Sequence, residues 1–340
     1  MDSSHNIQKN HVNPTPRIGG ISLVGGVFAA WLIALPERSE LLGFLLIAGL
    51  PALVFGLAED LTKSISILSR LLATMTSGVI GWALTGYSIT NVDIPYFDAL
   101  LGFTFFSISF TAFSVSGISN AVNIIDGVNG LASGFVFIAL VGLAALAQQV
   151  GDINLSIACL AIAGAVLGFV LFNWPFGKIF LGDGGSYFGG FAVAWGSVLL
   201  IERNTSVTAF VPLLICMHPV TEALFSIYRR RIRKQSLGHP DRLHLHSLVM
   251  RRVVRLALKK YLSIDTKKNF LLMNSMTGLL MLLMSLPPVI SSLFVLDKPA
   301  AAFLLCLIFV IIYITIYARI VNFRWCSPVT FLLPKKVIFN

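Results

Sequence analysis

The chain has 340 residues, of which 56% are hydrophobic and 12% are charged, and its formal net charge is +10. A soluble domain carries about 25% charged residues, so this composition excludes an ordinary water-soluble enzyme and indicates a protein that lies in lipid. The four cysteines stand far apart with no CxxC spacing, which argues against a disulfide framework or a zinc site.

Apolar runs of about 16 to 22 residues recur along the whole chain, close to the ~20 that a membrane-spanning helix needs. They predict an all-α, polytopic integral membrane protein with about ten transmembrane helices. The predicted spans are 19–36, 41–57, 70–87, 97–117, 131–150, 154–172, 187–202, 207–226, 270–290 and 299–318. The polar residues 1–17 contain no apolar stretch and so are not a signal peptide.

Lysine and arginine residues are distributed unevenly between the two sides of these spans. Only three of the 25 fall in the sparse set of loops, namely Arg38, Arg203 and Lys298. The positive-inside rule places the other set in the cytoplasm, and this pattern favours membrane orientation over nucleic acid as the reason for the charge. We expect one membrane domain over 1–340, with a cytoplasmic N-terminal segment (1–18), a basic cytoplasmic loop (227–269) and a cytoplasmic tail (319–340).

The segments with unusual polar chemistry all lie on the predicted cytoplasmic side. They are PTPRIGG (14–20), AED (58–60), NAVNIIDGVNG (120–130), FLGDGGS (180–186) and HPDRLHLH (239–246). A transporter would be expected to place such groups near the middle of the membrane, often on broken helices. Their collection at one face predicts an enzyme that acts on a soluble substrate at the bilayer surface.

Glu59 and Asp60 are adjacent carboxylates at the end of the second predicted span. Such a pair can bind a metal or divide acid and base roles. The alternatives are solvated charges at the interface or a simple helix cap.

The segment 120–134 carries several strong hydrogen-bonding side chains before a long apolar run. If it is helical around 119–126, Asn120, Asn123 and Asp126 share one face. That face would suit a magnesium ion and the phosphates it bridges, although a polar contact between helices is the alternative.

The segment 180–186 places Asp183 among Gly182, Gly184 and Gly185. Such a loop can present backbone N–H groups to an anion while the carboxylate holds a hard cation. A plain turn between spans is the alternative.

His244 and His246 lie in the basic loop with Arg242 close by. No third ligand completes a zinc site, and the neighbouring arginines make phosphate contacts the better interpretation. A solvated loop is the alternative. The basic cluster 229–234 is expected to anchor anionic headgroups, and Glu222 is expected to be a polar packing group.

Taken together, NAVNIIDGVNGLASG, FLGDGGS and PDRLHLH resemble the polyprenyl-phosphate N-acetylhexosamine-1-phosphate transferases of glycosyltransferase family 4. These membrane enzymes are related to the phospho-N-acetylmuramoyl-pentapeptide translocase. The similarity runs from about Pro14 to Arg252. The HLH segment is similar to the hexosamine branch, because the muramoyl-pentapeptide branch usually has a run of adjacent histidines there.

The resemblance implies a reaction in which a UDP-N-acetylhexosamine donates sugar 1-phosphate to undecaprenyl phosphate and UMP is released, with Mg²⁺ or Mn²⁺ as cofactor. It also implies a bacterial inner-membrane location, a site that faces the cytoplasm, and a product that initiates a lipid-linked surface glycan such as O-antigen. The partners would be the two substrates and the lipid bilayer, with no nucleic acid. A homodimer is left open.

The resemblance also implies roles for individual residues. Asp183 and Asn123 would be the metal ligands. The catalytic residues would be Asp60, Glu59 and Asp126, with Asp60 as the candidate base. The substrate contacts would be Asn120, Asn129, Gly184, Arg242, His244 and His246.

The chain departs from the family pattern in three ways. Glu59 stands where relatives often have aspartate, and Asn129 stands where many have aspartate. Relatives usually carry one more membrane helix before the PTPRIGG segment, so we expect that the family's first helix is missing here. Because of these departures, a catalytically inactive homologue that acts as a scaffold is the first alternative. A membrane transporter is the second.

Overall fold

A computed structural model of the chain describes residues 15–234, 243–261, 263–265 and 269–322. Every regular element in these residues is helical, and no strand occurs among them. A helix satisfies its backbone hydrogen bonds internally, which is what a chain in hydrocarbon requires. The all-α, multi-pass architecture predicted from the composition is confirmed.

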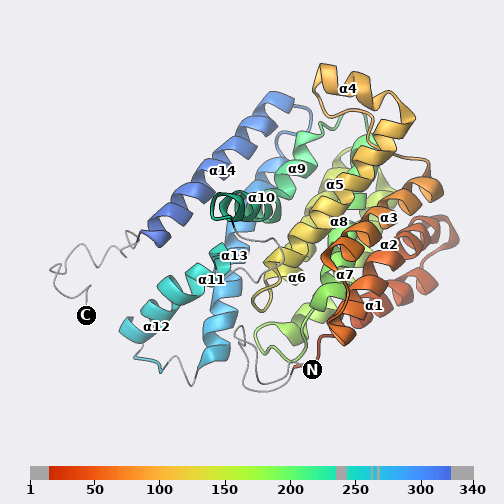
Figure 1. The fold of residues 1–340 in the computed structure, drawn as a ribbon. Helices are drawn as coiled ribbons and strands as arrows, with labels where there is room; N and C mark the ends of the chain where they lie inside the picture. The colour runs from red at the N-terminus through yellow and green to blue at the C-terminus, as the bar shows by residue number, and fades with distance from the viewer. Residues whose placement is uncertain (1–14, 235–242, 262, 266–268, 323–340) are drawn as a thin grey trace.

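Eight helices in the described residues are long and apolar enough to cross a membrane (Figure 1). They are α2 (Pro36–Thr62), α3 (Ile67–Thr85), α5 (Thr104–Ile125), α6 (Leu131–Gln149), α7 (Ile153–Asn173), α8 (Gly182–Arg203), α13 (Phe270–Ser292) and α14 (Pro299–Val321). The shorter elements are α1 (Gly19–Ile33), α4 (Pro95–Leu101), α9 (Phe210–Ile215), α10 (Met217–Ile232), α11 (Leu245–Val249), the π-helical turn η1 (Met250–Val254) and α12 (Arg255–Tyr261).

Eight of the ten predicted spans are single long helices in the described residues, and the two segments predicted at 19–36 and 207–226 take other forms. The helix α1 has 15 residues, which corresponds to about 22 Å and falls short of the ~30 Å hydrocarbon core. The predicted span 207–226 is divided at Cys216 into α9 and α10. Pro219 explains the division, because proline has no N–H for the carbonyl of Ile215 and its ring would clash with that carbonyl in a continuous helix.

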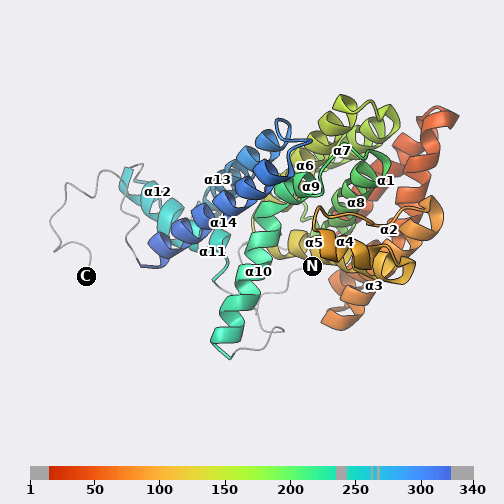
Figure 2. The same cartoon turned by 90° about the horizontal axis from the view of Figure 1, so that it is seen from above.

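The helix α10 runs in a different direction from the long helices. Figure 1 shows α10 nearly end-on while the long helices run obliquely across the picture, and Figure 2 shows α10 side-on as it leaves the bundle. Most of its exposed side chains are apolar, including Leu224, Ile227 and Ile232, with Arg231 in the last turn as the charged exception. Glu222 and Arg229 are buried. An apolar outer face and a polar inner face are what a helix that meets lipid on its outside requires. The inward position of Arg229 corrects the expectation that the whole cluster 229–234 faces headgroups.

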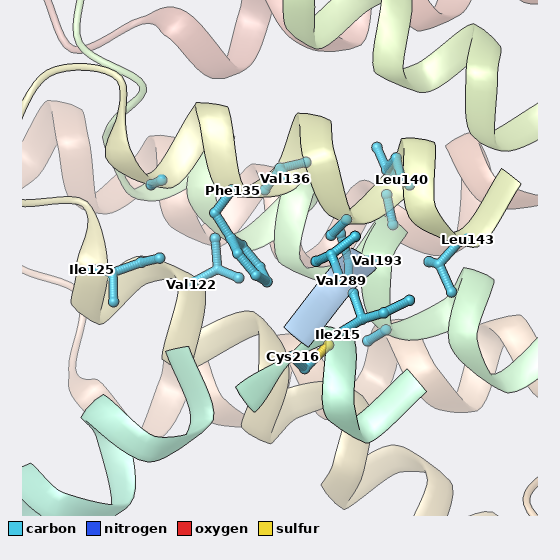
Figure 3. Close-up of a cluster of buried hydrophobic side chains, with 14 of the residues drawn as sticks. Val122, Ile125, Phe135, Val136, Leu140, Leu143, Val193, Ile215, Cys216 and Val289 are labelled. Carbon is cyan, nitrogen blue, oxygen red and sulfur yellow. The ribbon is translucent and has the colours of Figure 1, made fainter. Parts of the chain in front are cut away.

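The helix α8 forms the centre of the bundle and packs against α1, α2, α5 and α6. Small residues let its neighbours approach closely, as is common between membrane helices. A Cβ atom added to Gly56 of α2 would lie 2.5 Å from the Cα atom of Gly184 of α8. Beside α8, one buried apolar cluster takes Val122 from α5, Phe135 from α6 and Val193 from α8 (Figure 3). This core holds the N-terminal end of α8 at a fixed distance from the C-terminal ends of α2 and α5.

Candidate active site

The N-terminal end of α8 is fixed by the segment that leads into α1. The N–H of Phe180 donates to the carbonyl of Pro16 (3.0 Å), and the N–H of Gly19 donates back to the carbonyl of Phe180 (3.0 Å). Gly182 has a φ of 73°, and a Cβ atom there would lie 2.5 Å from Oδ2 of Asp60. The turn into α8 therefore needs glycine both for its backbone conformation and for the approach of Asp60.

Asp60, near the C-terminal end of α2, directs its carboxylate at the N-terminal end of α8. It is 6% exposed, and its Oδ2 accepts a hydrogen bond from the N–H of Gly184 (3.1 Å). A carboxylate in this position compensates the positive end of the α8 dipole. Its other oxygen, Oδ1, is buried without a hydrogen-bond partner in the described part of the chain, and Nζ of Lys63 lies 3.6 Å from it.

Asp183 lies in the first turn of α8 rather than in the loop expected from the sequence. Its Oδ2 accepts from Nη1 of Arg70 on α3 at 2.6 Å, and its Oδ1 accepts from Nδ2 of Asn123 on α5 at 3.1 Å. The same Asn123 amide also donates to the hydroxyl of Ser186 (2.8 Å). The two residues predicted to hold a metal are thus in direct contact.

Arg70 is a residue that the sequence analysis missed as a site residue. It lies in the first turn of an otherwise apolar helix, eleven positions after Glu59. From sequence alone, a single arginine at the predicted cytoplasmic end of a span is interpreted as a membrane anchor. Its half-buried side chain and its pairing with Asp183 are visible only in three dimensions.

Asp126 follows directly after the last residue of α5. Burial raises the pKa of its carboxyl to about 7; the charge of Arg17 opposes this shift, and the negative charges of Asp183 and Asp60 reinforce it. A carboxyl group that titrates near neutrality can either hold or accept a proton. The three aspartates therefore form one interacting group of negative charge at this end of the bundle.

The HLH segment docks onto the same place. His246 is buried, and a Cβ atom on Gly127 would lie 2.2 Å from its Nε2, so only glycine fits beneath the imidazole. The rings of His244 and His246 stack with their centroids 5.4 Å apart and 6° between their planes. The structure thus brings His246 next to the Asp126–Gly127 turn and stacks His244 on His246, although the turn and the histidines are 117 or more positions apart in sequence.

The other predicted site residues make contacts within the protein. Oε2 of Glu59 accepts from the N–H of Ile65 (2.9 Å) and closes the turn after α2. Nδ2 of Asn120 donates to the carbonyl of Ser116 (2.8 Å) and to the hydroxyl of Thr74 on α3 (3.2 Å). Gly184 gives its N–H to Asp60, as described above.

Asn129 was predicted to contact the substrate, and the structure places it against α13. It is 2% exposed, its N–H donates to Oδ1 of Asn274 (2.7 Å), and its amide lies 3.5 Å from the hydroxyl of Ser275. In this position an uncharged side chain is easier to bury than an aspartate. Arg242 lies outside the described residues.

Within the described residues, no group of three or more His, Cys, Asp or Glu side chains could hold a metal ion by itself. Magnesium does not need such a cage, since it is commonly bound by one or two carboxylates together with waters and substrate phosphates. The oxygen atoms of Asp183, Asn123 and Asp60 fit that pattern, and Oδ1 of Asp60, which is buried and accepts no hydrogen bond in the described residues, is one of them.

Residues 42–201 match the model of the family described as Glycosyl transferase family 4. This range contains Asp60, Arg70, Asn123, Asp126 and Asp183.

Several curated proteins are similar to the chain over most of its length. A probable undecaprenyl-phosphate N-acetylglucosaminyl 1-phosphate transferase of Bacillus subtilis (strain 168) is 29% identical over 72% of this chain and 68% of its own. An undecaprenyl-phosphate alpha-N-acetylglucosaminyl 1-phosphate transferase of Yersinia pestis is 30% identical over 72% of this chain and 68% of its own. A phospho-N-acetylmuramoyl-pentapeptide-transferase of Clostridium perfringens (strain 13 / Type A) is 31% identical over 56% of this chain and 64% of its own. With the matched residues surrounding one polar site at the end of a membrane bundle, the chain belongs to glycosyl transferase family 4.

Proposed function

We propose that this protein transfers N-acetylhexosamine 1-phosphate from a UDP-sugar to undecaprenyl phosphate. The observation that carries the proposal is the meeting of Asp183, Arg70, Asn123 and Asp126 with the two histidines at one end of a membrane bundle. Two relatives carry the names of undecaprenyl-phosphate N-acetylglucosaminyl 1-phosphate transferases, so UDP-N-acetylglucosamine is the first donor to test.

The chemistry of the reaction explains this set of side chains. An oxygen of the lipid phosphate forms a bond to the sugar-bearing phosphorus, and the bond from that phosphorus to the bridging oxygen breaks, with the electron pair leaving on UMP. Both reactants are anions that repel each other, so Arg70, His244 and His246 serve to hold phosphate oxygens. Asp60 and Asp126 are the carboxyl groups that can accept a proton from the lipid phosphate.

Mg²⁺ or Mn²⁺ is part of the proposal, with Asp183 and Asn123 as the residues that would hold it. A divalent cation supplies charge neutralisation at the phosphates. Arg70 donates to the same carboxylate and compensates part of its negative charge.

An open apolar cavity supports the proposal that the acceptor is a lipid. It has a volume of about 370 Å³, and its lining is apolar except for Ser114 and Ser197. The lining follows α5 from Phe110 to Ile118, and Ile118 lies five residues before Asn123, about 7.5 Å along the helix. A prenyl chain in this cavity would have its phosphate end directed along α5 toward the site.

Membrane orientation and pathway are also proposals. The concentration of lysine and arginine on one side supports a site that faces the cytoplasm of a bacterial inner membrane, where UDP-sugars are made. The product would then initiate a lipid-linked surface glycan such as O-antigen.

Removal of divalent metal from the purified protein in detergent is expected to lower UMP release by at least about 100-fold. The assay uses undecaprenyl phosphate and a panel of UDP-N-acetylhexosamines, and it follows UMP together with sugar label that enters the lipid phase. Addition of Mg²⁺ or Mn²⁺ after the chelator should restore transfer. Transfer that resists the chelator would overturn the metal proposal, and a folded protein that is silent with every donor would indicate an inactive homologue.

A further inference from the structure

The inner face of α10 carries a buried carboxylate whose hydrogen bonds lead to the site. Glu222 is 0% exposed. Its Oε1 lies 2.9 Å from Nδ1 of His244, its Oε2 accepts from the hydroxyl of Tyr313 on α14 at 2.7 Å, and the N–H of Leu245 approaches both oxygens at 3.2–3.3 Å. A buried carboxylate is costly unless it is paired and hydrogen-bonded, so this network holds its members in one arrangement.

These contacts form a continuous path from the C-terminal helix to the catalytic end of the bundle. Tyr313 bonds to Glu222, Glu222 bonds to His244, and His244 stacks on His246. His246 in turn packs against Gly127, which is next to Asp126. The path crosses α14, α10, the start of α11 and the turn after α5.

Two contacts tie the HLH segment and the π-helical turn η1 to α14, one just before His244 and one within η1. The hydroxyl of Tyr317 donates to the carbonyl of Leu243 (3.2 Å). Nη1 of Arg252 donates to the carbonyls of Ile320 (2.9 Å) and Val321 (2.7 Å), where a cation also compensates the negative end of the α14 dipole. The position of the two histidines therefore depends on where α14 lies.

We propose that Glu222 and Tyr313 are positioning residues that hold His244 and His246 against the substrate phosphates, so that α14 is a working part of the active site. This inference rests on the proposed transferase function. Both residues lie outside the range 42–201 that matches the family model. The physical reason is that a carboxylate on Nδ1 fixes the orientation of the imidazole and turns Nε2 away from Glu222.

Two substitutions change the network without removing much volume. Tyr313→Phe deletes only the hydroxyl that donates to Glu222. Glu222→Gln replaces one acceptor oxygen by an NH₂ group, which would face a donor, since His244, Leu245 and Tyr313 all converge there. We expect kcat/KM to fall about 10-fold in Tyr313→Phe and about 100-fold in Glu222→Gln, because misplacement by about 1 Å is sufficient for such a loss.

Ser285→Ala is the matched control for Tyr313→Phe. The Ser285 hydroxyl lies 2.6 Å from Nδ1 of His218, so its loss also removes one buried hydrogen bond to α10, four residues before Glu222. Both variants should lower the Tm in detergent by a similar amount. Only Tyr313→Phe should change kcat/KM, whereas Ser285→Ala should stay within about twofold of the parent protein.

A double-variant cycle with His244→Ala separates positioning from stability. If Tyr313 acts through His244, Tyr313→Phe should have no further effect on kcat/KM in the His244→Ala protein while it still lowers the Tm. An equal loss of activity in both backgrounds, or the same loss in Ser285→Ala, would overturn the inference. A parent protein that is inactive with every donor would instead contradict the proposed function.

Discussion

Asp183→Asn is expected to lower sugar-phosphate transfer by at least about 10³-fold. Asp183 is the point at which Arg70 and Asn123 converge, with contacts of 2.6 and 3.1 Å. Asparagine preserves the volume but removes the charge that would hold a divalent cation. The measurement is the initial rate of UMP release by the purified variant at saturating concentrations of both substrates.

The stability of this variant distinguishes a chemical role for Asp183 from a structural one. The Arg70 side chain is only 17% exposed, so Asp183→Asn leaves a poorly solvated cation without its carboxylate and should lower the Tm. Adding Arg70→Met should recover part of that stability, and transfer should remain lost. Recovery of transfer together with stability would show that Asp183 serves only to neutralise Arg70.

Asp152→Asn is the matched control for that experiment. Asp152 also pairs with an arginine at short distance, Nε of Arg203 at 2.7 Å. Asp152 precedes the first residue of α7 and Arg203 ends α8, so this pair lies at the opposite end of α8 from Asp183. We expect the rate of transfer to stay within about twofold of the parent protein.

Gly56→Ala is expected to reduce both stability and transfer, although Gly56 has no polar group to contribute. The added Cβ atom would lie 2.5 Å from Cα of Gly184 and 2.6 Å from the carbonyl carbon of Asp183. Both are backbone atoms that cannot rotate away, so α2 and α8 must separate. Overpacking of this kind costs about 1–3 kcal/mol, and a shift of Asp183 by about 1 Å should lower transfer about 100-fold. Thermal unfolding in detergent and UMP release measure the two effects.

Gly164→Ala tests the same substitution where the added atom meets nothing. Gly164 lies within α7, and no atom of a neighbouring element lies within 4 Å of a Cβ atom added there. Alanine favours a helix over glycine by about 1 kcal/mol, so stability should be unchanged or slightly higher and transfer unchanged. If Gly56→Ala behaves like Gly164→Ala, the close packing of α2 against α8 is wrong.

The class of protein could be predicted from local sequence because lipid imposes a local requirement. Each span must satisfy its own backbone and must be apolar over about 20 residues, and both properties are visible within one window of sequence. The same reasoning fails where a helix is interrupted. The run 207–226 is apolar throughout much of its length, but Pro219 ends the continuity of α9 and α10 and redirects the chain.

The composition of the site was partly predictable, but its pairings were not. Asn123 and Asp183 were predicted to act together from resemblance, and they are in contact. Arg70 gave no signal, because a single arginine at the end of a span has the same local pattern whether it anchors in lipid or pairs with a carboxylate. Its partner lies 113 residues away in sequence.

The partners of Glu222 were likewise not predictable from the sequence near it. The sequence suggested a packing group, since nothing near it identified His244 or Tyr313 as a partner. In the structure Tyr313 lies 91 residues further along the chain, on α14, whose sequence identifies it as a membrane span but does not indicate a polar partner. Asn129, which the resemblance predicts to contact the substrate, donates its N–H to Asn274 on α13, a partner that local sequence does not indicate.

The sequence by itself therefore determined that this protein lies in lipid, that it is helical, and which polar segments form the candidate site. Hydrophobic period and length are properties of neighbouring residues, so they can be read along the chain. Tertiary structure alone decided which charges neutralise each other, where α10 leaves the bundle, and which side chains orient the histidines. These outcomes depend on contacts between distant residues, whose free energy exists only when the helices have packed.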